Sequence, residues 1–232
     1  PYLVRELVEG EPLSTIIERE RTLPEDRLVT ILRHTCRGLA VAHEAGVMHR
    51  DIKPGNLLVQ EGDHVKITDF GVSRGTDQTT LTATGMVMGT AQYLAPELAL
   101  GKPATPASDL YAMGVIAFEA LVGKRPFTAA SAVDIAIAQV NEPVPPLPRT
   151  VSPQLARLVL QLLEKNPRKR PATALELDRI LADLDLVGSH APAPVVDPTP
   201  TPASSRRAMP PSIAPREYRP RPDVERRRPH TR

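Results

Sequence analysis

Features that many proteins depend on are scarce in this chain of 232 residues. It has a single cysteine, Cys36, and so cannot form an internal disulfide, which is consistent with a reducing compartment. No apolar run approaches the ~20 residues that a membrane-spanning helix requires. The chain opens with neither a methionine nor a charged signal-peptide segment. We therefore expect a cytoplasmic protein, in which any membrane attachment would come from segments outside this chain.

An excess of one charge is also lacking, since the formal net charge is only +2. The charges are unevenly placed, because residues 188–232 contain 9 arginines and 4 acidic residues together with 11 prolines. The preceding part is therefore weakly acidic, which excludes the basic footprint of a nucleic-acid-binding domain. The composition of residues 188–232 favours a disordered Pro/Arg-rich tail or juxtamembrane-type linker. An SH3-type ligand and an electrostatic tether to anionic lipid are the sharper alternatives for this tail.

Hydrophobic periodicity and capping residues predict a mostly helical body with a few short strands near its front. Thr22 with Glu25, and Thr173 with Glu176, have the spacing of capping boxes at helix starts. Residues 71–95 show no sustained periodicity, and such a long irregular segment in a compact domain is usually functional or mobile. Strands are expected at residues 1–9, 57–60 and 64–68, and helices from Thr22 to about Gly46, over 108–122, from Ser152 and from Thr173.

The stretch HRDIKPGN at residues 49–56 crowds charged and polar side chains between apolar segments. It is followed in order by Asp-Phe-Gly at 69–71, Gly-Thr at 89–90, Ala-Pro-Glu at 95–97, and Asp109 at the start of an apolar helix. These elements in this order resemble the catalytic half of a eukaryotic-type (Hanks-type) protein kinase. The segments GTAQYLAPE and GKRPF are similar to those of actinobacterial serine/threonine kinases. The resemblance implies the α+β protein-kinase-like fold, with a mostly helical C-terminal lobe and short strand pairs over residues 1–187.

The resemblance also implies a serine/threonine protein kinase that transfers the γ-phosphate of ATP to hydroxyl groups of proteins. Asp51 is expected to accept or orient the hydroxyl proton of the substrate, and Lys53 to meet the transferred phosphate. Asn56 and Asp69 present oxygens suited to Mg²⁺ or Mn²⁺. Lys53 is typical of serine/threonine rather than tyrosine kinases, and so is Thr90, which is placed to bridge Asp51 and Lys53.

Other residues carry over from the resemblance with supporting roles. The backbone from Glu6 to Val8 would meet the adenine ring as the hinge, and Leu58 would pack beneath that ring. Arg5 takes the gatekeeper position, where the family usually has an apolar or small residue. The remaining positions are His49 and Phe70 in a stacked apolar column, Gly71 at the turn that aims Asp69, Asp109 bonded to the catalytic-loop backbone, and Glu97 with Arg170 in a buried ion pair.

Arg50 is expected to have a regulatory role. Its guanidinium is well placed to bind a phosphate on the irregular segment by charge-assisted hydrogen bonds. Thr82 and Thr84 lie at the spacing where related bacterial kinases are autophosphorylated, and a homodimer could perform this reaction in trans. We expect phosphorylation to order the segment through Arg50. A threonine-rich loop without a regulatory role is the alternative.

The chain departs from the family by beginning at what resembles the hinge. The Gly-rich phosphate loop, the lysine that pairs with the α- and β-phosphates, and the glutamate partner of that lysine are absent. We expect a fragment of a longer gene product, with negligible kinase activity from these 232 residues alone. The alternative is a non-catalytic regulatory module that docks partners on its C-terminal lobe.

Overall fold

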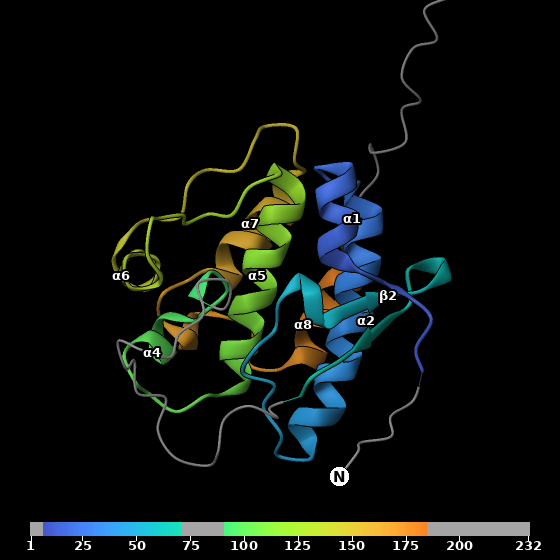
Figure 1. Cartoon of the computed structure of the whole chain (residues 1–232), viewed down its shortest axis with the longest axis horizontal. Helices are drawn as coiled ribbons and strands as arrows, with labels where there is room; N and C mark the ends of the chain where they lie inside the picture. The colour runs from blue at the N-terminus through green and yellow to red at the C-terminus, as the bar shows by residue number, and fades with distance from the viewer. Residues whose placement is uncertain (1–6, 71–90, 185–232) are drawn as a thin grey trace, which may run out of the picture. The chain divides into compact units, whose positions relative to one another are not determined.

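The computed structural model describes residues 7–70 and 91–184. These residues form a mostly helical body with one small antiparallel sheet, which agrees with the predicted class (Figure 1). The elements are β1 (Glu11–Pro12), α1 (Leu13–Glu20), α2 (Glu25–Glu44), β2 (Leu57–Val59), β3 (Val65–Ile67), α4 (Pro96–Ala99), α5 (Pro106–Val122), α6 (Ala132–Asn141), α7 (Pro153–Leu162) and α8 (Ala174–Ala182), with the 3₁₀ turns η1 (Pro54–Asn56), η2 (Glu61–Asp63) and η3 (Pro167–Lys169).

The central element is α5, which is apolar nearly all round, as the sequence predicts. Figure 1 shows it running through the middle of the body, with α7 on one side and α1 and α2 on the other. It begins two residues before the predicted start, because Thr105 and Ser108 form a capping box around Pro106. It ends at Gly123, which adopts the left-handed conformation that favours glycine. Nearly every side chain between Ser108 and Leu121 is buried, so α5 touches most other parts of the core.

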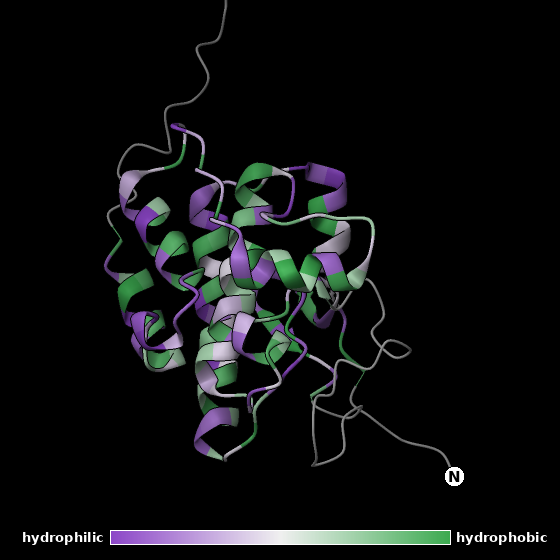
Figure 2. Ribbon diagram, turned by 90° about the vertical axis from the view of Figure 1, so that its left-hand side faces the viewer, coloured by the Kyte–Doolittle hydropathy of each residue, from purple (hydrophilic) through white to green (hydrophobic). Residues whose placement is uncertain are grey.

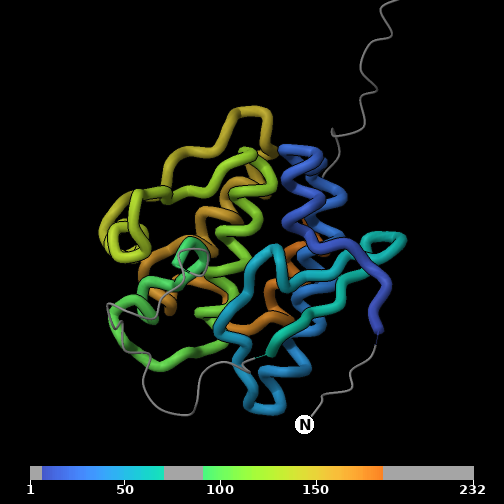
Figure 3. Tube along the Cα trace, viewed as in Figure 1, coloured from blue at the N-terminus to red at the C-terminus, as the bar shows by residue number. Residues whose placement is uncertain are grey.

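Around α5, the outer helices are amphipathic. The apolar stripe predicted on α2 comprises Leu28, Ile31, Leu32, Leu39 and Ala42; the first four are buried and Ala42 is half-buried. Figure 2 shows such two-faced helices, with hydrophobic residues on one side of the ribbon and hydrophilic residues on the other. Figure 3 shows that α8, near the end of the described chain, packs beside α2, near its start. The body is thus held together by contacts between segments far apart in the sequence.

The sheet is a three-stranded antiparallel arrangement in the order β1-β2-β3. The predicted strand pair is confirmed, with Leu57 opposite Ile67 and Val59 opposite Val65. The hairpin lies against α2, and Figure 1 shows it crossing that helix. The strand pair therefore connects the end of the 49–56 loop to Thr68 and Asp69 through a short, fixed path.

The predicted strand at residues 1–9 is wrong in its described part, because residues 7–9 are not in a strand. A two-residue strand, Glu11–Pro12, pairs with β2 instead. Proline has no N–H to donate, so the ladder ends there and the chain turns into α1. Helix α1, whose Leu13, Ile16 and Ile17 are buried, was not predicted from the sequence.

The predicted capping box at Thr22 and Glu25 is also wrong. The residue at the N-cap of α2 is Pro24, and no side chain caps this helix. The carboxylate of Glu25 instead accepts the backbone N–H of Ser152 at 2.7 Å. A long-range partner has therefore replaced the local one. The second expected cap is present, because the Thr173 hydroxyl accepts the Glu176 backbone N–H at 3.0 Å.

We predict that Gly114→Ala destabilises the protein. An added Cβ would lie 2.7 Å from the Leu162 Cβ and 3.3 Å from its backbone carbon, where α5 crosses α7. Overpacking costs about 1–3 kcal/mol, and alanine recovers at most about 1 kcal/mol through helix propensity. We expect a net loss of about 1–2 kcal/mol in urea unfolding. Gly55→Ala is the control, since its nearest neighbour would be Ser14 Oγ at 3.9 Å; equal losses in both variants would contradict the prediction.

Candidate active site

The loop of residues 49–56 is held by one buried carboxylate on α5. Asp109 is 2% exposed and accepts two backbone N–H groups, from His49 to Oδ2 and from Arg50 to Oδ1, each at 2.9 Å. Arg50 has a φ of 70°, a left-handed conformation that costs a residue with a side chain roughly 1–3 kcal/mol. The two charge-assisted hydrogen bonds offset this strain, so the loop adopts its shape only against α5.

A third group contacts the Asp109 carboxylate, and no sequence pattern predicted it. The Nε2 of His43, in the last turn of α2, lies 2.8 Å from Asp109 Oδ2. The Nδ1 of the same ring is buried, and no hydrogen-bond partner for it is present within the described parts of the chain. No sequence pattern separated His43 from an ordinary helical histidine. The contact forms only because α2 and α5 pack side by side.

His49 connects the loop to the strand pair. Its ring is fully buried, and its Nδ1 accepts the backbone N–H of Asp51 at 3.2 Å. The proton must then sit on Nε2, which donates to the Thr68 carbonyl at 2.9 Å. The His49 and Phe70 rings are in contact, with centroids 4.7 Å apart and planes at 55°. The two rings expected to form a column therefore lie against each other.

Three of the predicted catalytic side chains converge. The Lys53 ammonium lies 2.7 Å from Asp51 Oδ2, and the amide nitrogen of Asn56 lies 3.3 Å from the same oxygen. The Asn56 amide also donates to the Asp51 carbonyl at 2.8 Å. Asn56 is buried, whereas the side chains of Asp51 and Lys53 are about one-third exposed. The loop therefore presents one carboxylate and one cation to solvent from a rigid base.

Asn56 and Asp69 lie at the same end of the hairpin. The Asn56 carbonyl accepts the Thr68 N–H at 2.9 Å, and Asp69 follows directly, exposed and with a left-handed φ of 60°. Both residues offer oxygen atoms, the ligand type that Mg²⁺ prefers. In the described ranges, no three or more His, Cys, Asp and Glu side chains form a group that could hold a metal ion by themselves. Leu58, expected beneath an adenine ring, is half-buried in β2.

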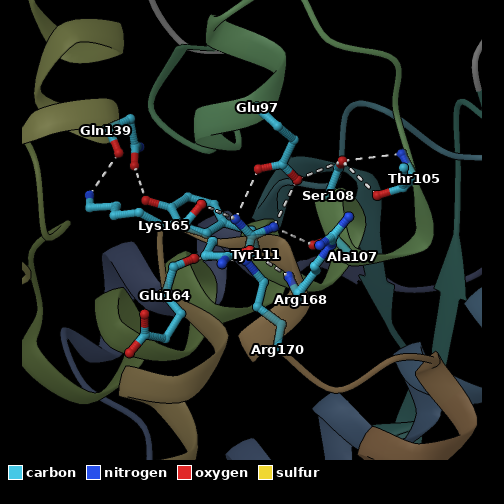
Figure 4. Close-up of polar contacts among 11 residues, drawn as sticks. Glu97, Thr105, Ala107, Ser108, Tyr111, Gln139, Glu164, Lys165, Arg168 and Arg170 are labelled. Atoms are coloured by element: carbon cyan, nitrogen blue, oxygen red, sulfur yellow. Dashed lines mark hydrogen bonds and ion pairs between the residues drawn. The ribbon is translucent and has the colours of Figure 1, made fainter.

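Glu97 and Arg170 form a buried ion pair beside the N-terminal start of α5 (Figure 4). Two parallel hydrogen bonds of 2.8 and 2.9 Å join the guanidinium to the carboxylate, and Ser108 donates to Glu97 at 2.8 Å. Arg170 also donates to the backbone carbonyls of Ala107 and Glu164. Burial raises the pKa of Glu97, but the hydrogen bonds from Arg170 outweigh this, and the pKa lies below its ordinary value.

A groove of about 330 Å³ adjoins Lys53, and no pattern in the sequence predicted it. Inside it, the Tyr93 hydroxyl donates to Glu119 at 2.6 Å. Arg125 contacts the side chain of Gln92, and its Nε lies 3.8 Å from Glu119. Burial raises the pKa of Glu119 above its ordinary value. The wall of this groove, made by Ser14, Ile17, Lys53, Gln92, Glu119 and Arg125 among others, thus mixes both charges.

Several predicted residues lie outside the described ranges. These are Arg5 and Glu6 near the start, and Gly71, Thr82, Thr84 and Thr90 in the irregular segment. Val8 is described and is half-buried outside any helix or strand. Their roles stay predictions, as does the assignment of residues 1–187 to a hinge and C-terminal lobe and of 188–232 to a tail.

Comparison with known proteins decides the family. The profile described as "Protein kinase domain" matches residues 1–180. The chain belongs to the protein kinase family. It is 49% identical over 169 residues to serine/threonine-protein kinase PknA of Mycobacterium tuberculosis strain H37Rv. It is 45% identical over 193 residues to serine/threonine-protein kinase drp72 of Corynebacterium efficiens, and 38% identical over 201 residues to PknL of M. tuberculosis. The resemblance to bacterial Hanks-type serine/threonine kinases is thereby confirmed.

The matches cover most of this kinase chain but a smaller part of its relatives. They include 73% of the chain for PknA, 83% for drp72 and 84% for PknL. They span 39%, 37% and 50% of those relatives, respectively. No helix in residues 7–70 and 91–184 has both the length and the apolar character needed to cross a membrane.

We predict that Arg170→Met destabilises the kinase chain more than the double variant Glu97→Gln/Arg170→Met. The single substitution leaves the Glu97 carboxylate buried without its counterion, which typically costs about 3–5 kcal/mol. The double variant leaves no uncompensated charge. Urea unfolding of the two single variants and the double variant at pH 7 measures the coupling energy.

The pH dependence of this coupling is the control. The folded-state pKa of Glu97 lies below the ordinary value of 4.5, so its stabilising effect is complete above pH 4.5. The effect is lost as the pH falls through the lowered folded-state pKa, where the carboxylate becomes protonated. A coupling energy that is near zero at pH 7, or that grows on acidification below pH 4.5, would contradict the assignment of an ion pair.

Proposed function

We propose that this chain is the part of a serine/threonine protein kinase that positions the acceptor hydroxyl and the transferred phosphate. The observation that carries the proposal is the convergence of Asp51, Lys53 and Asn56 on a loop anchored by Asp109. Family membership supplies the reaction class, because protein kinases in general use ATP and a divalent metal ion. We also propose residues 1–187 as the hinge and C-terminal lobe, and 188–232 as a Pro/Arg-rich tail.

Asp51 is the residue we assign to the substrate hydroxyl. Phosphoryl transfer passes through a loose transition state, so the protein mainly positions groups and neutralises charge. The contacts of Lys53 and Asn56 both fall on Oδ2 of Asp51, which leaves Oδ1 to accept the hydroxyl hydrogen. The Lys53 side chain is partly exposed and can contact a phosphate while it restrains Asp51.

Asn56 and Asp69 are the residues we assign to the metal ion. The side-chain nitrogen Nδ2 of Asn56 donates to the backbone and side chain of Asp51. The side-chain oxygen Oδ1 of Asn56 is therefore the atom that can face a cation. An amide oxygen and a carboxylate are hard ligands, which fit Mg²⁺ or Mn²⁺. When bound, such an ion would neutralise negative charge on the phosphates of ATP. For the nucleotide base we propose the backbone of Glu6 to Val8 and the side chain of Leu58.

The central test uses the longest gene product that contains this chain, with ATP, Mg²⁺ and a protein rich in serine and threonine. Asp51→Asn removes the proton acceptor, so we expect phosphate incorporation to fall about 10²–10⁴-fold. Asp183→Asn, an exposed carboxylate at the end of α8, is the matched control and should be neutral. Incorporation on tyrosine alone would overturn the serine/threonine assignment. Incorporation by the native protein no higher than by Asp51→Asn would overturn the proposal in favour of a non-catalytic module.

Phosphorylation of Thr82 and Thr84 is the proposed regulation. The Arg50 side chain is exposed beside Asp51, where a phosphate could pair with its guanidinium. We expect Thr82→Ala/Thr84→Ala to lower the initial rate at least about fivefold, the lower range of coupling energies between sites. Mixing an inactive Asp51→Asn copy with a native copy tests whether the reaction occurs in trans between two copies. Unchanged rates in the double alanine variant would refute this regulation.

A further inference from the structure

We propose that Gln139 of α6 is a positioning residue for protein substrates. Its side chain fixes the backbone at Gln92, which forms part of the groove beside Lys53. This groove would bind the substrate residues that flank the acceptor hydroxyl. The inference rests on the kinase function proposed above. Gln139 is far along the chain from the catalytic loop, and no motif in the sequence marks it.

The amide of Gln139 is fully buried and bonded at both ends. Its Nε2 donates to the Gln92 carbonyl at 2.8 Å, and its Oε1 accepts the Tyr111 hydroxyl. Its own backbone carbonyl accepts the Lys165 ammonium at 2.7 Å. Figure 4 shows Gln139 facing both Lys165 and Tyr111. One side chain therefore links α6 to α5 and to the segment that precedes α4.

The orientation of this amide is determined by its neighbours. A carbonyl can only accept a hydrogen bond, so Nε2 must face Gln92 and Oε1 must face Tyr111. Tyr111 is itself fixed, because its ring is fully buried and the Arg170 guanidinium lies 4.7 Å from its centroid. The Lys165 ammonium lies 4.2 Å from the Phe127 ring centroid. Burial lowers the pKa of Lys165 to about 8, and a neutral amine still donates to the Gln139 carbonyl.

Gln92 connects Gln139 to the groove, because it is bonded to Gln139 and also lines the groove wall. Its carbonyl is bonded to Gln139, while its side chain and that of Tyr93 contact Arg125 and Glu119 in the groove wall. Gln92 is half-buried, and a carbonyl that loses its partner beside the fully buried Gln139 side chain is costly, so loss of the Gln139 amide should displace the Gln92 backbone. Lys53 lies in the same wall but is held separately by Asp51. The displacement should therefore weaken substrate binding and leave the catalytic loop intact.

The test compares Gln139→Met with Tyr111→Phe in the longest gene product that contains this chain. Gln139→Met keeps the side-chain volume and removes both hydrogen bonds of the amide, to Gln92 and from Tyr111. Tyr111→Phe removes only the second bond and keeps the donor to Gln92. We expect KM for a serine/threonine protein substrate to rise about five- to thirtyfold in Gln139→Met, as one lost buried hydrogen bond implies. KM for ATP, kcat, and the substrate KM of Tyr111→Phe should change less than about twofold.

Two results would overturn the proposal. One is an unchanged substrate KM in Gln139→Met; the other is an equal rise in Tyr111→Phe, which would mean a general loss of packing. If Gln139→Met does not fold, Gln139→Asn shortens the side chain by one methylene and applies the same test.

A readout without catalysis separates this proposal from the proposed function. Backbone hydrogen exchange in residues 91–95 should be faster in Gln139→Met and unchanged in Tyr111→Phe. This result supports the positioning role even if the native protein transfers no phosphate, in which case only the proposed function fails. Equal exchange in the native protein and Gln139→Met overturns the positioning role alone.

Discussion

The buried carboxylate of Asp109 is the interaction on which the candidate active site depends. An ionised carboxylate is expensive to bury unless hydrogen bonds satisfy its oxygens. Here it accepts two backbone N–H groups from the loop of residues 49–56 and contacts the His43 ring from α2. The loop and the helix that precedes it are thereby fixed to α5 at one point. The strained backbone at Arg50 is held by the same contact.

Other polar side chains along α5 likewise hold neighbouring segments by hydrogen bonds. The helix is apolar nearly all round, yet its buried and half-buried polar side chains contact different segments. Ser108 donates to Glu97, Tyr111 to Gln139, and Glu119 accepts from Tyr93. Hydrophobic packing gives this helix its central position, and the few polar groups decide which segment lies where. Loop geometry is thus determined by directional bonds from a rigid element.

Predictions from the sequence succeeded where local chemistry decides the outcome. The apolar run of α5, the stripe of α2 and the β2–β3 hairpin follow from patterns within a few residues of each other. They failed where a distant partner competes with a local one. Glu25 has the spacing of a capping box, but the backbone N–H of Ser152 binds its carboxylate. Strand β1 is short because Pro12 has no N–H with which to continue the ladder. Helix α1 follows without a capping side chain, so the sequence carries no clear signal for its start.

By itself, the sequence determined the family and the residue types of the site, since ordered motifs such as HRDIKPGN carry that chemistry in their spacing. It also placed Asp51, Lys53 and Asn56 on one short loop. Only the tertiary structure decided that Lys53 and Asn56 share one oxygen of Asp51, that His43 joins Asp109, and that Gln139 holds Gln92. The physical reason is that a hydrogen bond depends on distance and angle, and residues far apart in the chain acquire these only when the helices pack.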